Sequence, residues 1–233
     1  MDSSFEPAES ERAIDAALAG RGVEPPLRSS LARYGRLVLE ANRRLNVTGA
    51  RTSTALAEQL TDSLTVVPFV AAPYLDVGSG AGFPAIPVAL ASGVEPTMVE
   101  ATLKKARFLE SLLPALGLSG SVVAERAELA AHREDLREQF SSVTCRAVAG
   151  AAASAELTLP FLKIGGLAIL QRGAMEREER VALDDALLVL NGAVEAEVML
   201  EGARRLVLLR KNAATHGRFP RRPGIPSRRP LCQ

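Results

Sequence analysis

The sequence contains few of the residues that mark several common classes of protein. Its two cysteines, Cys145 and Cys232, lie in dissimilar surroundings, so we expect neither a disulfide framework nor a metal site, but two unpaired thiols in a reducing compartment. No apolar run approaches the roughly 20 residues that span a bilayer. The acidic, polar stretch Met1–Pro7 does not resemble a signal peptide. These absences predict a cytoplasmic protein that does not associate with a membrane.

Aromatic residues and histidines are also scarce, which narrows the expected chemistry. Only 4% of the residues are aromatic, so extensive stacking of nucleic-acid bases on the protein is not expected. His132 lies in a charged helical stretch and His216 in a basic tail, where solvated surface histidines are predicted. Cys145 lies inside an apolar run and is predicted to be a buried thiol rather than a nucleophile. The sequence therefore offers no evident catalytic dyad.

Acidic residues are absent from the C-terminal segment after Glu201. The net charge of the whole chain is +1, yet every charged residue from Ala203 to Gln233 is basic. A segment of one sign either meets a polyanion or is a solvated tail, and composition alone leaves both open. Four prolines stand among the arginines from Asn212 onward, so this tail is predicted to be extended rather than helical.

The first part of the chain has helical periodicity and no strand signal. Apolar residues recur at helical spacing from Leu27 to Leu45, after a break at Gly20–Gly22. A turn is expected at 46–49, and Ser53 and Thr54 are suited to cap a third helix. Residues 1–72 are therefore predicted to form a small helical segment packed on the core.

From Tyr74 onward, strand and helix patterns alternate. The predicted strands are 74–78, 96–100, 121–125, 141–147, 167–172, 194–200 and 205–210. The predicted helices between them are 84–91, 103–116, about 127–138, 152–162 and 175–190. Short connections between these elements predict right-handed βαβ units and a parallel sheet covered on both faces, and the last two strands read as an antiparallel hairpin. We expect an α/β, Rossmann-like domain over residues 73–212, with a mostly parallel seven-stranded sheet and an antiparallel edge strand, followed by a basic tail over 213–233.

A glycine-rich turn follows the first predicted strand. Gly78, Gly80 and Gly82 stand at alternate positions after Asp76. Glycine can adopt positive φ and lets the backbone approach a ligand closely. Pro84 suits the first turn of the helix that follows. In open α/β sheets, a strand, a glycine turn and a helix in this order hold nucleotide-like cofactors.

Two cofactors are compatible with such a turn, and the residues favour one of them. The dinucleotide fingerprint G-x-G-x-x-G requires glycine where this chain has Phe83, which disfavours a nicotinamide cofactor. S-adenosyl-L-methionine carries a sulfonium and an amino acid moiety instead of a pyrophosphate. Asp76 is well placed for its methionine end, and Glu100, after the second strand, for the ribose hydroxyls. Each acid taken alone could be an ordinary turn or surface residue, but the pair at this spacing favours S-adenosyl-L-methionine.

Several segments in the right order resemble one family. The most specific are 76–87, 100–109, 146–149 and 219–226, and the likeness extends to 45–51, 62–64, 159–166 and 205–208. With these segments the chain resembles the RsmG (GidB) family, bacterial methyltransferases that act on guanine N7 of 16S ribosomal RNA. The resemblance covers nearly the whole chain. It implies S-adenosyl-L-methionine as cofactor, S-adenosyl-L-homocysteine as product, and 16S ribosomal RNA or the small ribosomal subunit as partner.

The resemblance also implies roles for individual residues. The implied cofactor-binding residues are Asp76, Gly78, Gly80, Gly82, Phe83, Glu100, Ala127, Glu128 and Arg146. Within this set, Glu100 would face the ribose, Ala127 and Glu128 the adenine, and Arg146 the mouth shared by cofactor and substrate. Arg146 and Arg172 are the candidates for positioning the reactants, and no metal is implied. The candidate RNA-phosphate contacts are Lys104, Lys105, Arg107, Arg172, Arg221 and Arg222.

The chain departs from the family pattern at a few positions. Ala85 stands where many members have glycine, Glu58–Gln59 where Lys-His is frequent, and Arg172 where lysine is usual. The last two departures concern contact with RNA, because arginine and lysine do not bind phosphate equivalently. We expect a monomer, and two alternatives remain: a nicotinamide-dependent oxidoreductase and a non-catalytic RNA-binding protein.

Overall fold

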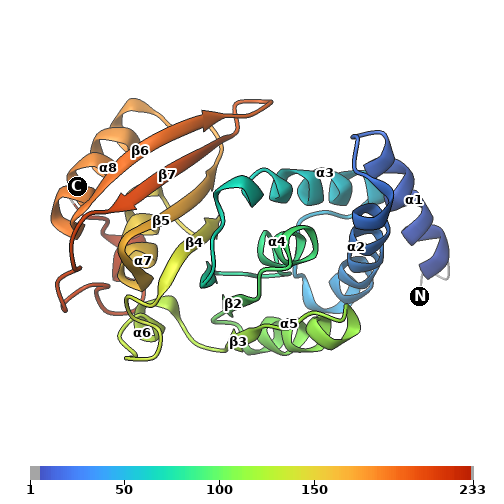
Figure 1. Ribbon diagram of the computed structural model, residues 1–233, viewed down its shortest axis with the longest axis horizontal. Coiled ribbons are helices and arrows are strands. Elements are labelled where there is room, and N and C mark those ends of the chain that lie inside the picture. Colours follow the sequence, from blue (N-terminus) through green and yellow to red (C-terminus); the bar gives the residue numbers. More distant parts are fainter. Residues whose placement is uncertain (1–5, 232–233) are drawn as a thin grey trace.

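The computed structural model describes residues 6–231 of the chain (Figure 1). Cys232, predicted above to be an unpaired thiol, lies outside the described residues. The N-terminal part is helical, as predicted, with α1 (Pro7–Ala19), α2 (Pro25–Leu45), α3 (Ser53–Leu64) and the short 3₁₀ helix η1 (Val67–Phe69). The side chain of Thr52, one residue before the predicted caps, accepts a hydrogen bond from the Ala55 N–H and caps α3.

A seven-stranded sheet forms the centre of the molecule. Its strands are β1 (Tyr74–Val77), β2 (Pro96–Val99), β3 (Ser121–Val123), β4 (Phe140–Arg146), β5 (Leu162–Arg172), β6 (Gly192–Met199) and β7 (Arg205–Lys211). Their order is β3-β2-β1-β4-β5-β7-β6. Strands β1 to β5 pair in parallel, whereas β7 runs antiparallel to both β5 and β6. The predicted mostly parallel sheet with an antiparallel hairpin at its edge is confirmed.

Helices cover both faces of the sheet, as the near-continuous apolar strands require. They are α4 (Ala85–Ser92), α5 (Leu103–Ala115), α6 (Ala127–Ala130), α7 (Ala151–Thr158), η2 (Leu159–Phe161), α8 (Arg177–Leu190) and α9 (Ile225–Arg228). Side chains alternate along the strands: Ile169 packs with the N-terminal helices and α4, while Ala168 and Leu170 pack with α7 and α8. Figure 1 shows α1 at one end of the molecule and α8 with the β6–β7 hairpin toward the other.

The bounds of two predicted elements differ most from the structure. The helix predicted over about 127–138 is α6, which ends at Ala130. Between His132 and Gln139 the chain offers one apolar side chain, Leu136, so a longer helix would bury no face, and Leu136 is instead buried by a series of turns. Strand β5 begins at Leu162 rather than at residue 167, directly after η2.

The tail was predicted to be extended, and this is wrong for its last part. Residues 225–228 form α9, with Gly224 at its N-cap in the left-handed conformation at φ +79°. Pro226 lies in the first turn, where its missing N–H removes no helical hydrogen bond. The tail is also docked on the sheet domain, since Phe219 is 2% exposed within the core on the α7–α8 side. Among the helices of residues 6–231, none is long and apolar enough to cross a bilayer.

Candidate active site

The glycine turn between β1 and α4 is closely packed by its surroundings. Gly78, Gly80 and Gly82 have φ values of +72°, +58° and +104°, which side-chain-bearing residues rarely adopt. A Cβ at Gly78 would lie 2.5 Å from Val148 Cγ2, and one at Gly82 would lie 2.6 Å from Ile86 Cγ1. Backbone conformation therefore favours glycine at all three positions, and lack of space requires it at Gly78 and Gly82.

The amides of this turn are already used inside the protein. The backbone N–H groups of residues 78, 79, 80, 82 and 83 all donate to Val99 O, Ser79 O or the Glu100 carboxylate. A dinucleotide site instead presents amides at a helix N-terminus to the pyrophosphate. Because those donors are occupied here, the turn does not form an open cradle for phosphate groups.

Asp76 lies beneath the turn at the end of β1 and is fully buried. Its Oδ1 accepts a hydrogen bond of 2.6 Å from the Thr144 hydroxyl, and Thr144 Oγ1 lies 2.7 Å from the Tyr74 hydroxyl. Its Oδ2 is buried without a hydrogen-bond partner. Burial raises the pKa of the Asp76 carboxyl from 3.8 to about 7, against the opposing effect of the Thr144 hydrogen bond. A buried oxygen without a partner suits a cationic or N–H-bearing ligand.

Glu100 follows β2 and fixes the shape of the same turn. Its Oε2 accepts the Gly80 N–H at 2.9 Å, and its Oε1 accepts the Thr102 N–H at 2.7 Å. Each oxygen keeps a further lone pair for a hydroxyl group, because a carboxylate offers about four acceptor positions. The residue is 7% exposed. The predicted ribose contact is compatible with this geometry.

Glu128 opens α6 and is held by the C-terminal tail. Its Oε1 accepts the Gly224 N–H at 2.8 Å and Arg126 Nη2 at 2.7 Å. Burial raises the pKa of the Glu128 carboxyl, whereas the hydrogen bonds from Arg126 and Gly224 lower it. The lowering effects together are larger, so the net shift of the pKa is downward. Ala127 precedes it and is half-buried. The sequence did not predict this contact, because its two ends lie far apart along the chain.

Arg146 ends β4 and connects the glycine turn to α3. Its guanidinium carbon lies 5.7 Å from the centroid of the Phe83 ring. Its Nη1 lies 3.3 Å from Ser63 Oγ and 3.6 Å from Asp62 Oδ2. The side chain is 20% exposed. Arg146 therefore lies between the glycine turn and the N-terminal helices, and its place at the mouth of a cofactor site stays a prediction.

Arg172, by contrast, is held by internal partners. Its guanidinium pairs with Glu179 of α8 and donates to the Ala149 carbonyl oxygen, and its Nε is buried without a partner. The side chain is 16% exposed. An arginine held in this way is a poor candidate for an open phosphate contact. Its place at the end of β5 remains close to Arg146, since the two residues line one cavity.

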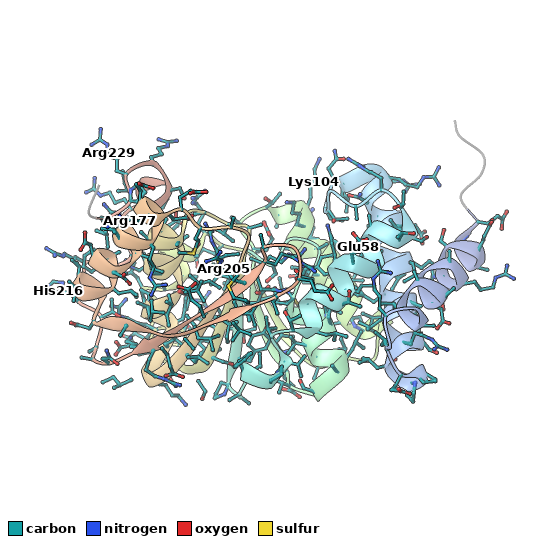
Figure 2. All side chains as sticks on the ribbon, turned by 90° about the horizontal axis from the view of Figure 1, so that it is seen from above. Glu58, Lys104, Arg177, Arg205, His216 and Arg229 are labelled. Carbon is teal, nitrogen blue, oxygen red and sulfur yellow. The ribbon has the colours of Figure 1, made fainter. Side chains whose placement is uncertain are left out.

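The other predicted RNA contacts fall into two groups. Lys104 and Arg107 are exposed on α5, Lys105 is half-buried, and within residues 6–231 no carboxylate pairs with these three cations. Arg222 is exposed, whereas Arg221 pairs with the fully buried Glu156 of α7 at 2.7 Å. Arg221 is therefore a structural anchor rather than a free cation. Figure 2 shows Lys104 and Arg229 projecting on the same side of the molecule.

Some residues of the site have no clear signal in the sequence. The Tyr34 hydroxyl of α2 donates to the Ala81 carbonyl of the turn at 2.9 Å, and its ring lies 5.4 Å from that of Phe83. Asp62 of α3 forms an ion pair with Arg204 of the hairpin, with 3.0 Å between Asp62 Oδ1 and Arg204 Nη1. Figure 1 shows the tip of the β6–β7 hairpin lying over the end of α3. Only the family-like segment 62–64 could have suggested Asp62.

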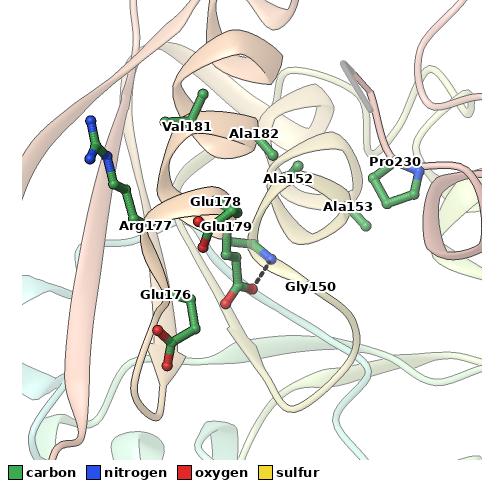
Figure 3. Close-up of a pocket in the computed structure, with 11 residues that line it drawn as sticks. Gly150, Ala152, Ala153, Glu176, Arg177, Glu178, Glu179, Val181, Ala182 and Pro230 are labelled. Carbon is green, nitrogen blue, oxygen red and sulfur yellow. Dashed lines mark hydrogen bonds between the residues drawn. The ribbon is translucent and has the colours of Figure 1, made fainter.

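Two cavities lie near the carboxyl ends of the parallel strands. One of 360 Å³ is bordered by the ends of β4 and β5, by α3 and by the hairpin. The other, of 660 Å³, lies between the starts of α7 and α8, with Pro230 on its far side (Figure 3). The second cavity is lined by Glu176, Glu178 and Glu179, and Glu179 caps α7 by accepting the Ala151 N–H. Its acidic lining does not suit a nucleic acid.

Known proteins resemble this chain in sequence and fold. A family described as rRNA small subunit methyltransferase G matches residues 27–208. A ribosomal RNA small subunit methyltransferase G from Trichormus variabilis is 38% identical over 226 residues, covering 88% of this chain and 92% of that protein. A protein of the same name from Chloroflexus aggregans is 42% identical over 200 residues, covering 82% and 84%. In fold, the structure of a putative O-methyltransferase from Klebsiella pneumoniae is similar with a TM-score of 0.55, at 15% identity over 88% of this chain and 99% of that one.

Proposed function

The chain belongs to the rRNA small subunit methyltransferase G family, and we propose that it methylates the N7 atom of one guanine in 16S ribosomal RNA. As a member of this family it is an S-adenosyl-L-methionine-dependent ribosomal RNA methyltransferase. The observation that carries the cofactor assignment is the orphaned Oδ2 of Asp76, beneath a turn whose amides are already occupied. A sulfonium cofactor with an amino group suits that oxygen, whereas a pyrophosphate would find the amides of residues 78, 79, 80, 82 and 83 already engaged.

The residues around the turn fit this cofactor. We assign Asp76 to its methionine end, Glu100 to its ribose, and Ala127 with Glu128 to its adenine. Gly78 and Phe83 line the site, and Gly80 and Gly82 shape the turn. When bound, S-adenosyl-L-methionine supplies an electrophilic methyl group on a positively charged sulfur.

The protein's own task is then alignment. Guanine N7 carries a free lone pair and no proton, so no residue has to act as a general base. This agrees with Cys145, whose thiol is buried and whose pKa burial raises to about 12, too high for a nucleophile at neutral pH. Arg146 is positioned to orient the base at the mouth of the site, where holding two reactants in line can lower a barrier by ~7–11 kcal/mol in favourable cases.

The two alternatives are less compatible with the site. A nicotinamide-dependent oxidoreductase needs a pyrophosphate cradle and a proton donor, and the turn does not present the cradle. A non-catalytic RNA-binding protein would not need the glycine turn, Asp76 and Glu100 together. We further propose that the protein acts as a monomer in the cytoplasm, where its ribosomal substrate is found.

Methyl transfer from labelled S-adenosyl-L-methionine tests the proposal. Naked 16S RNA and small ribosomal subunits lacking the modification are each incubated with the protein, and the modified base is mapped. We expect one methyl group per RNA, at N7 of a single guanine. Incorporation at another atom would contradict the N7 assignment. Binding of NADH without binding of S-adenosyl-L-methionine in calorimetry would contradict the cofactor assignment.

A further inference from the structure

The 360 Å³ cavity at the ends of β4 and β5, which Arg146 connects to the glycine turn, has polar walls. Its volume falls within the usual range for small-molecule sites, about 300–1,000 Å³. The charged and amide side chains that line it are Asp62, Arg146, Gln171, Arg172, Arg204 and Arg205. They come from α3, from the ends of β4 and β5, and from the start of β7. The sheet topology thus brings four separate segments of the chain to one pocket.

The arginines of this cavity are largely neutralised, which bears on its ligand. Arg204 pairs with Asp62, Arg205 with Glu197, and Arg172 with Glu179. Arg146 lies 3.6 Å from the second oxygen of Asp62. With most of its positive charge already paired, the cavity suits a polar neutral group better than a phosphate.

Two acceptor groups in the cavity have spare capacity. Gln171 is 7% exposed, its Nε2 donates to the Asp62 backbone oxygen at 2.9 Å, and its Oε1 is buried without a partner. The Asp62 carboxylate accepts one short hydrogen bond, from Arg204, and a long one of 3.4 Å from Gln171. It therefore retains unused lone pairs. Among the described residues that line this cavity, Asp62 is the acidic one.

The chemistry of guanine matches these acceptors. N7 lies on the Hoogsteen edge of the base, and the opposite, Watson–Crick edge carries the N1–H and the N2 amino group. A site can therefore leave N7 free for methylation by holding the base at its Watson–Crick edge, one of the edges on which bases of unpaired RNA are read. Both groups there are donors and need acceptors. Adenine presents a bare N1 at the same place and would meet the carboxylate lone pair to lone pair.

The position of the cavity agrees with this orientation. Arg146 contacts Asp62 in the cavity, and its guanidinium also lies over the ring of Phe83 in the glycine turn. Val77 pairs with Cys145, so the residues that follow them, Gly78 and Arg146, leave neighbouring strands at the same edge of the sheet. A base with its Watson–Crick edge at Asp62 would direct N7 back across Arg146 toward the turn.

We propose that Asp62 selects the target base by accepting the N1–H and one N2 hydrogen of the guanine, while Gln171 Oε1 accepts the other N2 hydrogen. This assignment rests on the proposed function. It makes Asp62 and Gln171 specificity-determining residues of the substrate pocket, separate from the residues assigned to the cofactor. It also gives the hairpin a role, since Arg204 holds the Asp62 carboxylate in place.

The test combines a change in the enzyme with a change in the base. The target guanosine of 16S RNA is replaced by inosine, which keeps N1–H, O6 and N7 but lacks the N2 amino group. We expect kcat/KM of the wild-type protein to fall roughly 10- to 100-fold on the inosine RNA, the range for a lost base-reading hydrogen bond. Asp62→Asn is expected to be slow by a similar factor on guanosine. On inosine its further loss should be smaller than the loss of the wild-type protein, because the two changes share one hydrogen bond, that between Asp62 and the N2 amino group.

Controls separate recognition from folding. Asp184→Asn removes a carboxylate that pairs with Arg180 on the surface of α8 and should leave both rates unchanged. Thermal unfolding shows whether each variant is folded at the assay temperature, and the affinity of Asp62→Asn for S-adenosyl-L-methionine should match the wild type. The wild-type comparison of guanosine with inosine does not depend on the folding of any variant.

Each remaining outcome overturns the inference. Equal wild-type rates on guanosine and inosine would show that the N2 amino group is not read. Losses that multiply fully in Asp62→Asn on inosine RNA would show that Asp62 does not accept an N2 hydrogen of the base. In both cases N7 methylation of guanosine by the wild-type protein would leave the proposed function standing. Methylation at an atom other than N7 would instead remove the proposed function and this inference together.

Discussion

Asp76, which we propose to contact the methionine end of the cofactor, is a buried carboxylate with one unpartnered oxygen. The Thr144 hydroxyl donates its one proton to Asp76, so the Tyr74 hydroxyl must donate to Thr144 when Asp76 is ionised. These three groups form one hydrogen-bonded chain across β1 and β4. The chain leaves Oδ2 of Asp76 without a partner, and burial raises the pKa of the carboxyl to about 7. The cofactor-free protein therefore holds a carboxylate that is poorly stabilised in its charged form.

This raised pKa predicts a dependence of stability on pH. Because the folded pKa lies above the usual 3.8, the folded state binds a proton that the unfolded state lacks between about pH 4 and pH 7. The free energy of unfolding should therefore fall as the pH rises through this window and level off above it, with a contribution on the order of 4 kcal/mol from Asp76. Asp76→Asn should lack this contribution.

Urea denaturation without cofactor at about pH 4.5 and about pH 8 measures the effect. The difference in unfolding free energy between Asp76→Asn and the wild type should grow in favour of the variant as the pH rises. A difference that stays constant across the window would mean that Asp76 is solvated and ionised in the free protein. Thr144→Val removes the hydrogen bond to Oδ1 and should raise the pKa of Asp76 further, which serves as a check on its cause.

At the residue scale, the sequence predicted the residues that short spacing brings together, but not the contacts between segments that lie far apart along the chain. Asp76, Glu100 and the glycine turn belong to one strand–turn–helix unit and the strand beside it, so spacing was enough to bring them together. The pairing of Arg172 with Glu179 and the unpartnered Oε1 of Gln171 were not predictable. Asp62 meets Gln171 and Arg204 only because α3, β5 and the hairpin converge in the fold.

At the scale of elements, the C-terminal tail is more ordered than its composition suggests. Its prolines predicted an extended tail, and its arginines left contact with a polyanion and a solvated tail both open, yet the tail docks on α6 and α7. Arg221 donates from its side chain and its backbone N–H to Glu156, whose side chain is fully buried. Arg137 donates to the carbonyl oxygens of Thr215 and Phe219, and His132 lies 2.9 Å from that of Pro220. The surface histidine predicted at 132 is exposed and also contacts the tail.

The ion pair between Arg221 and Glu156 should contribute to the free energy of unfolding by holding the tail on α7. Arg221→Ala would leave the Glu156 carboxylate buried without its cation, which typically costs about 3–5 kcal/mol in unfolding free energy. The neighbouring variant Arg222→Ala, at an exposed position, is the matched control and should change stability by less than about 0.5 kcal/mol. Urea denaturation compares the two. Equal stabilities would show that the tail does not dock in solution.

Element boundaries were less predictable than element types, and the reason is local. The residues after Ala130 include good helix formers, but only Leu136 among residues 132–139 is apolar, so a longer helix would bury no face. The turns that follow α6 are held by Arg137, which donates to the carbonyl oxygens of Ala131 and, in the tail, of Thr215 and Phe219. These contacts with the tail carry no sign in the sequence of α6.

At the scale of the whole molecule, the fold places some cations in ion pairs within the protein and leaves others exposed to solvent. The net charge of +1 gives no indication of this separation. Arg146, Arg172, Arg204, Arg205 and Arg221 are engaged by carboxylates in the protein, while Lys104, Arg107 and Arg222 are exposed. The fold class, the antiparallel edge of the sheet and the N-terminal helical segment could be predicted from local patterns alone. The division among the cations required the assembled structure.

Exposed cations that bind phosphate should make RNA binding depend on salt. Each single-stranded phosphate contact lowers the slope of log K against log salt by ~0.7, because a counterion is released. Removing one contact should therefore make the slope shallower by about that amount. We expect this for Lys104→Ala and for Arg222→Ala, which remove exposed cations from α5 and from the tail.

Arg12→Ala is the matched control for these variants. Arg12 is exposed on α1, which Figure 1 places at the end of the molecule away from the hairpin, and its loss should leave the slope unchanged. Fluorescence anisotropy with 16S RNA between about 50 and 200 mM salt measures the slopes. A slope that stays the same in Lys104→Ala and Arg222→Ala would place the phosphate contacts elsewhere. A flat profile for the wild-type protein would mean that RNA is held mainly through the base pocket, in which case the neutralised cavity at Asp62 would account for both affinity and specificity.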